Sequence, residues 1–218
     1  MTTISTVLFD LDGTLVDTAP GLGAALNVLR EERGLPVLPL ASVREVVSQG
    51  VKGLLKVAFD LDKNISNFNE LKEKFIAIYR KSLVTENRFF PHIEEVLTHL
   101  DEQGIAWGIV TNNLTQTTHA LLKAIMLRHQ PACIVCGDTL TRAKPHPDTI
   151  LHACQLLQQN PANCLYVGDA VTDVIASKAA NMRAIVALYG YLQSTDDPFS
   201  WGADGYINQP LELIEFLR

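Results

Sequence analysis

The sequence predicts an α/β fold, with a parallel sheet covered by helices on both faces and a helical domain inserted near its start. Three observations lead to this prediction. Short, continuously apolar segments alternate with segments of helical periodicity, a pattern typical of buried parallel strands and their crossover helices. Residues 17–83 show helical periodicity alone. Of the 218 residues, 47% are hydrophobic, which is enough to bury a core of this size.

The predicted strands are short apolar runs. The first covers residues 6–9 and ends at Asp10. We expect the later runs to pair with it in parallel, because helical segments separate them. These runs cover residues 105–110, 132–136, 164–167, 183–188 and 205–208.

The predicted helices of the sheet domain lie between these strands. Residues 91–103 place Ile93, Val96 and Leu100 at helical spacing and end before Gly104, a residue typical of helix C-termini. Further helices are predicted at residues 114–126, 147–158, 171–180 and 211–217.

The segment after the first strand is interpreted as an inserted helical domain of residues 17–84, which leaves residues 1–16 and 85–218 to the sheet domain. Its apolar stripes are Leu22, Leu26 and Leu29, then Val43, Val46 and Val47, then Phe75, Ile76 and Tyr79. Loops are expected at residues 34–39 and 60–69, and hinges near residues 16–19 and 83–88. The alternative is four helices packed directly on the sheet; the insert is preferred because a strand-to-helix connection is normally only a few residues long.

Composition excludes some classes of protein. A net charge of −6 and a pI of about 5.5 argue against a nucleic-acid binder that neutralises phosphates, although a local cluster of donors can still hold a small anion. The longest unbroken apolar run, residues 184–192, is about half the length of a membrane helix, and no apolar leader follows Met1. We therefore expect no membrane partner and a cytoplasmic location; whether the protein is a monomer or a homodimer is left open.

The four cysteines are too few for a disulfide scaffold. Cys133 and Cys136 form a C-x-x-C pattern, but they lie in a predicted buried strand. We interpret all four as small core residues of a reducing compartment rather than as zinc or redox ligands.

Polar residues follow four of the predicted strands. They are Asp10 and Asp12, Thr111–Asn113, Lys144–Asp148, and Asp169 with Asp173. Ligands of an open parallel sheet bind beyond the carboxyl ends of its strands. We therefore expect these side chains to converge on one pocket for a metal ion and a phosphate.

Asp10 and Asp12 form a pair of carboxyl groups that could act together in phosphoryl transfer. One carboxylate can attack phosphorus and form an aspartyl-phosphate, and a second carboxyl group can protonate the leaving oxygen and then take a proton from water. Gly13 indicates a bend that separates the two side chains. The alternative is that both acids only end a strand in an Asx turn.

The remaining residues predict a metal site and an anion clamp. Asp10 and Asp169 offer hard oxygen ligands for Mg²⁺; Asp173 is expected to bind it through water or to orient Lys144, or else only to cap a helix. Thr111 and Asn112 stand where a helix begins and can hold phosphate. Lys144 adds positive charge for the transition state, the alternative being a solvated surface lysine.

These motifs, in this order, resemble the four motifs of the haloacid dehalogenase superfamily. The resemblance spans the whole chain and implies a Rossmann-like three-layer core, a Mg²⁺ cofactor and a phospho-aspartate intermediate. It implies that Asp10 is the nucleophile, Asp12 the acid/base and a metal ligand through its main-chain carbonyl, and that Thr111, Asn112 and Lys144 bind phosphate. Asp10, Asp169 and Asp173 complete the metal set, and the insert resembles the family's helical cap.

Within the superfamily, the sequence is similar to phosphoglycolate phosphatases and to a bacterial set that includes N-acetylmuramic acid 6-phosphate phosphatases. Asn113 and Asn181 depart from the usual residues of this branch, and we expect neither to touch the chemistry. The resemblance implies a phosphatase of a small phosphorylated metabolite; a sugar phosphomutase or a non-catalytic binding protein are the alternatives. Candidates for substrate selection in the cap are Arg44, Ser48, Gln49, Gly50 and Lys52, although Arg44 and Lys52 also fit solvated helix charges.

Overall fold

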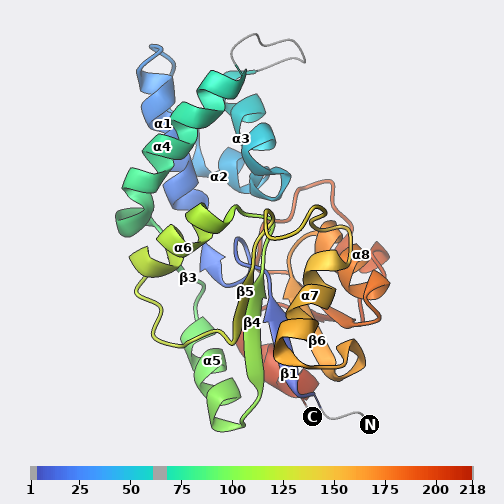
Figure 1. Cartoon of the computed structure of the whole chain (residues 1–218). Coiled ribbons are helices and arrows are strands. Elements are labelled where there is room, and N and C mark those ends of the chain that lie inside the picture. Colours follow the sequence, from blue (N-terminus) through green and yellow to red (C-terminus); the bar gives the residue numbers. More distant parts are fainter. Residues whose placement is uncertain (1–3, 61–67, 218) are drawn as a thin grey trace.

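A computed structural model describes residues 4–60 and 68–217 of the chain, and its centre is a parallel sheet (Figure 1). The strand order is β5-β4-β1-β6-β7-β8, and every neighbouring pair is parallel. The strands are β1 (Thr6–Phe9), β4 (Ala106–Val110), β5 (Cys133–Val135), β6 (Cys164–Gly168), β7 (Arg183–Ala187) and β8 (Gly205–Ile207). The predicted α/β class and all six predicted strands are confirmed.

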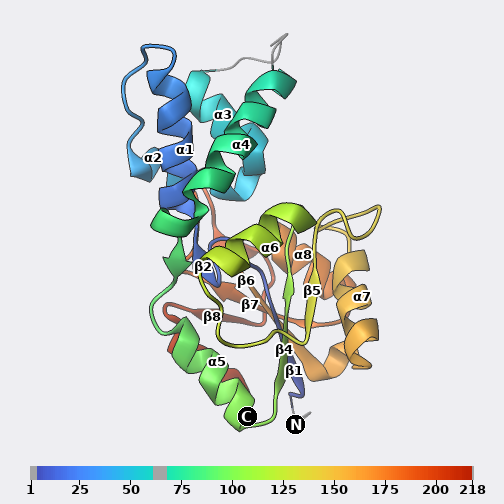
Figure 2. The same cartoon turned by 60° about the vertical axis from the view of Figure 1, so that its left-hand side comes forward.

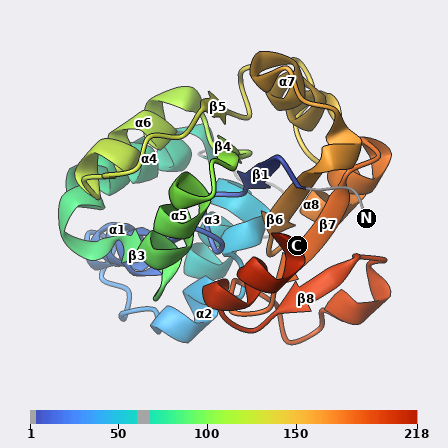
Figure 3. The same cartoon turned by 90° about the horizontal axis from the view of Figure 1, so that it is seen from below.

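Helices cover both faces of this sheet, as its apolar strands require. Val7 and Phe9 of β1 pack in one hydrophobic cluster, whereas Leu8 packs in another, because successive side chains of a strand point to opposite faces. The first cluster includes residues of α5 (Ile93–Glu102), α6 (Thr115–Ala124) and the closing η4 (Pro210–Leu217). The second includes residues of α7 (Asp148–Leu157) and α8 (Val171–Ala179). The result is a three-layer arrangement, seen from below in Figure 3.

The predicted helical insert consists of α1 (Ala19–Glu31), α2 (Leu40–Arg44), η1 (Val47–Gln49), α3 (Gly50–Phe59) and α4 (Phe68–Glu86). Figures 1 and 2 show that these helices lie beyond one end of the strands and not on a face of the sheet. This is the end that carries Asp10, Thr111 and Asp169. The predicted loop at residues 60–69 falls mostly outside the described residues, and α4 already begins at Phe68. The division into domains at residues 16/17 and 84/85 stays a prediction.

Two short elements join the insert to the sheet region. β2 (Val16–Asp17) and β3 (Arg88–Phe89) pair antiparallel, with Val16 opposite Phe89 and Asp17 opposite Arg88. β2 falls in one predicted hinge and β3 begins at the last residue of the other, so the chain leaves and re-enters the sheet region through adjacent, hydrogen-bonded segments. Two-residue strands have no recognisable periodicity, which is why the sequence did not predict them.

The remaining predictions concern the end of the chain, the cysteines and membranes. The closing segment is a 3-10 helix instead of the expected α-helix, and it buries Pro210, Leu213 and Leu217. All four cysteines are free and buried, and burial raises the pKa of Cys133 to about 11. Within residues 4–60 and 68–217, no helix combines the length and the apolar character needed to span a bilayer.

Candidate active site

Three adjacent strands position the core of the site. β1 lies between β4 and β6, so Asp10, Thr111 and Asp169, which follow these strands, meet at one edge. Main-chain hydrogen bonds carry the strand pairing into the site, since the N–H of Asp10 donates to Val167 O at 2.9 Å and that of Thr111 to Val135 O at 3.0 Å. The backbone pairing therefore fixes the positions from which the side chains of Asp10 and Thr111 extend.

Three carboxylates gather at this edge. One oxygen from each of Asp10, Asp169 and Asp173 lies within 4.8 Å of the other two. Asp169 and Asp173 are 1% and 2% exposed. Three carboxylates in such a small volume repel one another and call for compensating positive charge.

Lys144 supplies part of that charge. Its Nζ lies 2.8 Å from Asp10 Oδ1 and 2.7 Å from Asp173 Oδ1, and its side chain is 2% exposed. The hydroxyl of Tyr166, at 2.7 Å, and the carbonyl of Val110, at 2.9 Å, complete its surroundings. Lys144 is therefore a buried member of the site and not a solvated surface lysine.

Asn112 holds the main chain of Lys144. Its Nδ2 donates to Lys144 O at 2.9 Å, and the N–H of Lys144 donates to Asn112 Oδ1 at 3.1 Å. Both polar atoms of this side chain position the lysine loop, and binding of phosphate by Asn112, expected through its main-chain N–H, stays a prediction. Thr111 is 2% exposed, and its hydroxyl accepts the N–H of Asn113 at 3.2 Å.

Burial and crowding shift the pKa values of the site. Burial, opposed by Lys144 and reinforced by Asp173, raises the pKa of Asp10 to about 7. The pKa of Asp169 is raised well above its ordinary value by burial and then by the charges of Asp10 and Asp173. Burial alone would lower the pKa of Lys144, but the charges of Asp10 and Asp173 raise it. Lys144 is therefore an ammonium, and its single charge does not balance the three acids.

Asp12 is two residues from Asp10 but is not part of this cluster. The chain bends at Gly13, whose φ of +83° favours glycine. Asn113 Nδ2 donates to Asp12 Oδ2, and burial raises the pKa of Asp12. The expectation that Asn113 does not touch the chemistry is therefore wrong, since its amide directly contacts the predicted acid/base. Asn181, the other departure, adopts φ 55°, a left-handed conformation that asparagine tolerates.

The loop after β7 holds Asp169 in place, which the sequence did not predict. The N–H of Tyr191 donates to Asp169 Oδ2 at 2.7 Å, and the hydroxyl of Thr14 donates to Oδ1 at 3.3 Å. Gly190 lies so close that an added Cβ would be 2.3 Å from the Asp169 Cβ. No motif marks Tyr191 as a partner, because the contact is made by its main chain.

One cavity of about 460 Å³ connects these residues with the helical insert. From the insert, Ser48, Gln49, Gly50 and Lys52 line it, as anticipated. Arg44 does not line it. Its guanidinium instead lies 2.5 Å from Asp17 Oδ2 and over the ring of Tyr191, so the prediction that it faces the site is corrected.

The carboxylate cluster suits a divalent cation. All its ligand atoms are hard oxygens, the type that Mg²⁺ prefers, and Lys144 leaves an excess of negative charge among them. The residues present therefore fit a metal ion held by Asp10 and Asp169. Asp173 is already bound through Oδ1 to Lys144 and through Oδ2 to the N–H of Ala170 at 3.0 Å.

Comparison with known proteins agrees with this geometry. Residues 7–187 match the family model described as haloacid dehalogenase-like hydrolase. The chain belongs to this family. The haloacid dehalogenase-like fold accounts for the parallel core, and the four sequence motifs coincide with the four groups of residues that surround the cavity.

Individual relatives lie within the same family. The chain is 40% identical to a phosphoglycolate phosphatase of Xanthomonas campestris pv. campestris over 209 residues, which cover 96% of this chain and 94% of the relative. It is 33% identical to the N-acetylmuramic acid 6-phosphate phosphatase of Pseudomonas putida, covering 95% and 93%. The crystal structure of a predicted phosphoglycolate phosphatase from Haemophilus somnus 129PT superimposes with a TM-score of 0.88, at 26% identity and full coverage of both chains.

Proposed function

We propose that the protein is a Mg²⁺-dependent phosphatase that hydrolyses a small phosphomonoester through a phospho-aspartate on Asp10. One observation carries the proposal: Asp10, Asp12, Thr111 and Lys144 line a single cavity beside a cluster of acids that suits a metal ion. The names of the relatives support the same reaction class.

The first half-reaction transfers the phosphoryl group to the protein. A carboxylate oxygen of Asp10 forms a bond to phosphorus while the bond from phosphorus to the ester oxygen breaks. Asp12 gives its proton to the departing oxygen, so the alcohol leaves neutral. The raised pKa of Asp12 favours the protonated form that this step needs.

The second half-reaction returns the protein to its starting state. Asp12, now a carboxylate, takes a proton from water as the water oxygen attacks phosphorus, and the bond to Asp10 breaks to release inorganic phosphate. Lys144 lies 2.8 Å from Asp10 Oδ1, where its charge offsets the negative charge of the phosphoryl oxygens. Mg²⁺ held by Asp10 and Asp169, with the main-chain carbonyl of Asp12 as a further proposed ligand, would supply further positive charge there.

Release of inorganic phosphate tests this proposal. Wild-type protein with Mg²⁺ is expected to hydrolyse members of a panel of phosphate esters, including phosphoglycolate and N-acetylmuramic acid 6-phosphate. Asp10→Asn is expected to lose turnover by several orders of magnitude, since an amide is a poor nucleophile. Turnover retained in Asp10→Asn would show that another group attacks phosphorus. A cytoplasmic location, part of the same proposal, is tested by cell fractionation.

A further inference from the structure

The cavity is larger than the phosphate-transfer chemistry requires. Its volume of about 460 Å³ lies in the range of roughly 300–1,000 Å³ that accommodates drug-sized ligands. Phosphoglycolate is a two-carbon ester and would leave most of this space to water. The volume therefore fits a substrate with a bulky organic part.

Much of the cavity wall that the helical insert contributes is apolar. It is formed by side chains of α1, α3 and α4, including Leu22, Val51, Leu54, Phe75 and Tyr79. The rings of Phe75 and Tyr79 stack with centroids 6.1 Å apart and planes 5° apart. Such a surface gains free energy by covering apolar substrate atoms, and a two-carbon acid has almost none to offer.

Two lysines give this end of the cavity positive charge. Lys52 of α3 and Lys72 of α4 both line it, and neither forms an ion pair with any residue in the described ranges 4–60 and 68–217. Lys144 is already committed to Asp10 and Asp173. Lys52 and Lys72 are thus available to a second anionic group of the substrate, remote from its phosphate.

Resting on the proposed function, we infer that the substrate is a phosphate ester of a sugar-sized body that carries an apolar face and a carboxylate. The apolar wall packs against the body, and Lys52 or Lys72 binds the carboxylate. The catalytic acids and Lys144 hold the phosphate at the other end of the cavity. Among the compounds named for the relatives, N-acetylmuramic acid 6-phosphate has this chemistry and phosphoglycolate lacks the body.

Substrate comparison provides the first test. We expect kcat/KM for N-acetylmuramic acid 6-phosphate to exceed that for phosphoglycolate by more than about tenfold, because each buried apolar group contributes about that factor or more. N-acetylglucosamine 6-phosphate, which has a similar ring but no carboxylate, is expected to fall between them. Equal values for the two acids, or a preference for phosphoglycolate, would overturn the inference.

Two pairs of variants on α3 locate the effect. Val51→Trp fills the cavity and is expected to lower the ratio of the two kcat/KM values by about tenfold, whereas Val57→Trp alters a residue that is 36% exposed and does not line the cavity. Lys52→Met is expected to lower the discrimination, in kcat/KM, between N-acetylmuramic acid 6-phosphate and N-acetylglucosamine 6-phosphate. Lys56→Met is the control, and Lys52→Arg is the conservative variant that keeps the positive charge. If only Lys72→Met lowers this discrimination, the carboxylate of the substrate binds at α4. Ratios unchanged in Val51→Trp and in both lysine variants would contradict the inference.

Failure of the inference and failure of the proposed function give different results. If no ester of the panel, p-nitrophenyl phosphate included, releases phosphate, the proposed function is wrong. If phosphate is released but the small acid is preferred, the phosphatase assignment stands and the inferred substrate class is wrong.

Discussion

Lys144 and Asp173 form a buried ion pair, with Nζ 2.7 Å from Oδ1 and side chains 2% and 3% exposed. Asp173 lies in the first turn of α8, and its other oxygen accepts the N–H of Ala170. The acid is therefore fixed at a helix N-terminus and holds the ammonium beside Asp10. Of the roles expected for Asp173, this arrangement favours orientation of Lys144, together with capping of α8, over binding of the metal ion through water.

Asp173→Asn should destabilise the protein and slow turnover. The neutral amide binds the buried ammonium more weakly than the carboxylate does, although Asp10 still pairs with Lys144, and losing a hydrogen bond to a charged group costs about 1.5–3 kcal/mol in unfolding free energy. Urea unfolding followed by circular dichroism measures the loss. Glu70→Gln is the control, because it removes the exposed pair between Lys74 and Glu70 and such pairs contribute little. Wild-type stability in Asp173→Asn would show that the pair does not hold Lys144 in place.

Asp12→Asn should affect esters according to their leaving group. An alkyl phosphate needs a proton on its departing oxygen, so its kcat should fall by about 10²–10⁴-fold. The p-nitrophenyl ester leaves readily as an anion, and its first half-reaction should fall much less. Single-turnover measurements on both esters separate this step from hydrolysis of the intermediate. An equal loss for both would argue against proton donation by Asp12.

The pH dependence of the wild-type protein tests the same assignment. Burial raises the pKa of Asp12, and a general acid must carry its proton. As pH rises through that pKa the donor is lost, so single-turnover rates with an alkyl ester should decline on the alkaline side. The p-nitrophenyl ester should show a weaker decline, and a stronger one would contradict the assignment.

Metal removal should lower both activity and stability. EDTA is expected to abolish turnover, and added Mg²⁺ to restore it. Because a ligand that binds only the folded state stabilises it, Mg²⁺ at about 100 times its Kd should add about 2.7 kcal/mol, seen as a higher Tm. Asp169→Asn removes a carboxylate of the cluster and should shrink this shift. A Tm insensitive to Mg²⁺ in the wild type would argue against the site.

The parallel core could be predicted because its strands are buried on both faces. Strands such as β1 and β6 are continuous apolar runs followed by acids, and the strand order places those acids together. Asp10 and Asp169 were therefore readable from position alone. The burial of Lys144 was harder to predict, since the local sequence around a single lysine in a loop does not indicate that it is buried.

Other contacts of the site depend on the tertiary fold and could not be predicted from the local sequence. Tyr166 reaches Lys144 from the middle of a strand, where it reads as an ordinary core aromatic. Arg44 was a candidate for substrate selection in the cap, but its guanidinium pairs with Asp17. Asn113 departs from the usual residue of its branch and was expected to have no part in the chemistry. Its side-chain amide nevertheless donates a hydrogen bond to Asp12, which lies 101 residues away in the sequence.

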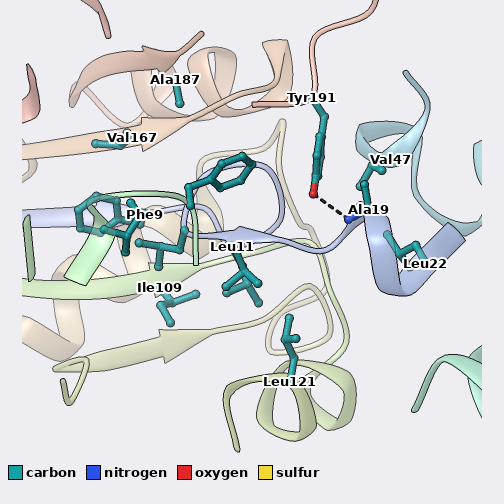
Figure 4. Packing of buried hydrophobic residues seen from close by; sticks show 14 of the residues in the cluster. Phe9, Leu11, Ala19, Leu22, Val47, Ile109, Leu121, Val167, Ala187 and Tyr191 are labelled. Carbon is teal, nitrogen blue, oxygen red and sulfur yellow. Dashed lines mark hydrogen bonds between the residues drawn. The ribbon is translucent and has the colours of Figure 1, made fainter. Parts of the chain in front are cut away.

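Tyr191 connects the helical insert with a predicted metal ligand. Its hydroxyl donates to Asp17 Oδ1 at 2.7 Å and accepts the N–H of Ala19 at 2.8 Å, at the start of α1 (Figure 4). Its carbonyl accepts the hydroxyl of Ser48 at 3.2 Å, while its N–H holds Asp169. Tyr191 thus contacts the helical insert through its hydroxyl and its carbonyl, and the predicted metal ligand Asp169 through its main-chain N–H.

Tyr191→Phe separates these roles, because it removes the hydroxyl and keeps the main-chain bond to Asp169. The buried N–H of Ala19 then lacks its acceptor, and unfolding free energy should fall by about 1–3 kcal/mol. Tyr206→Phe is the matched control, since its hydroxyl donates to Phe199 O at 3.3 Å in an exposed position, and it should change stability little. The Tm shift on adding Mg²⁺ should persist in Tyr191→Phe. Loss of that shift would mean that the hydroxyl, through the start of α1, also determines where Asp169 lies.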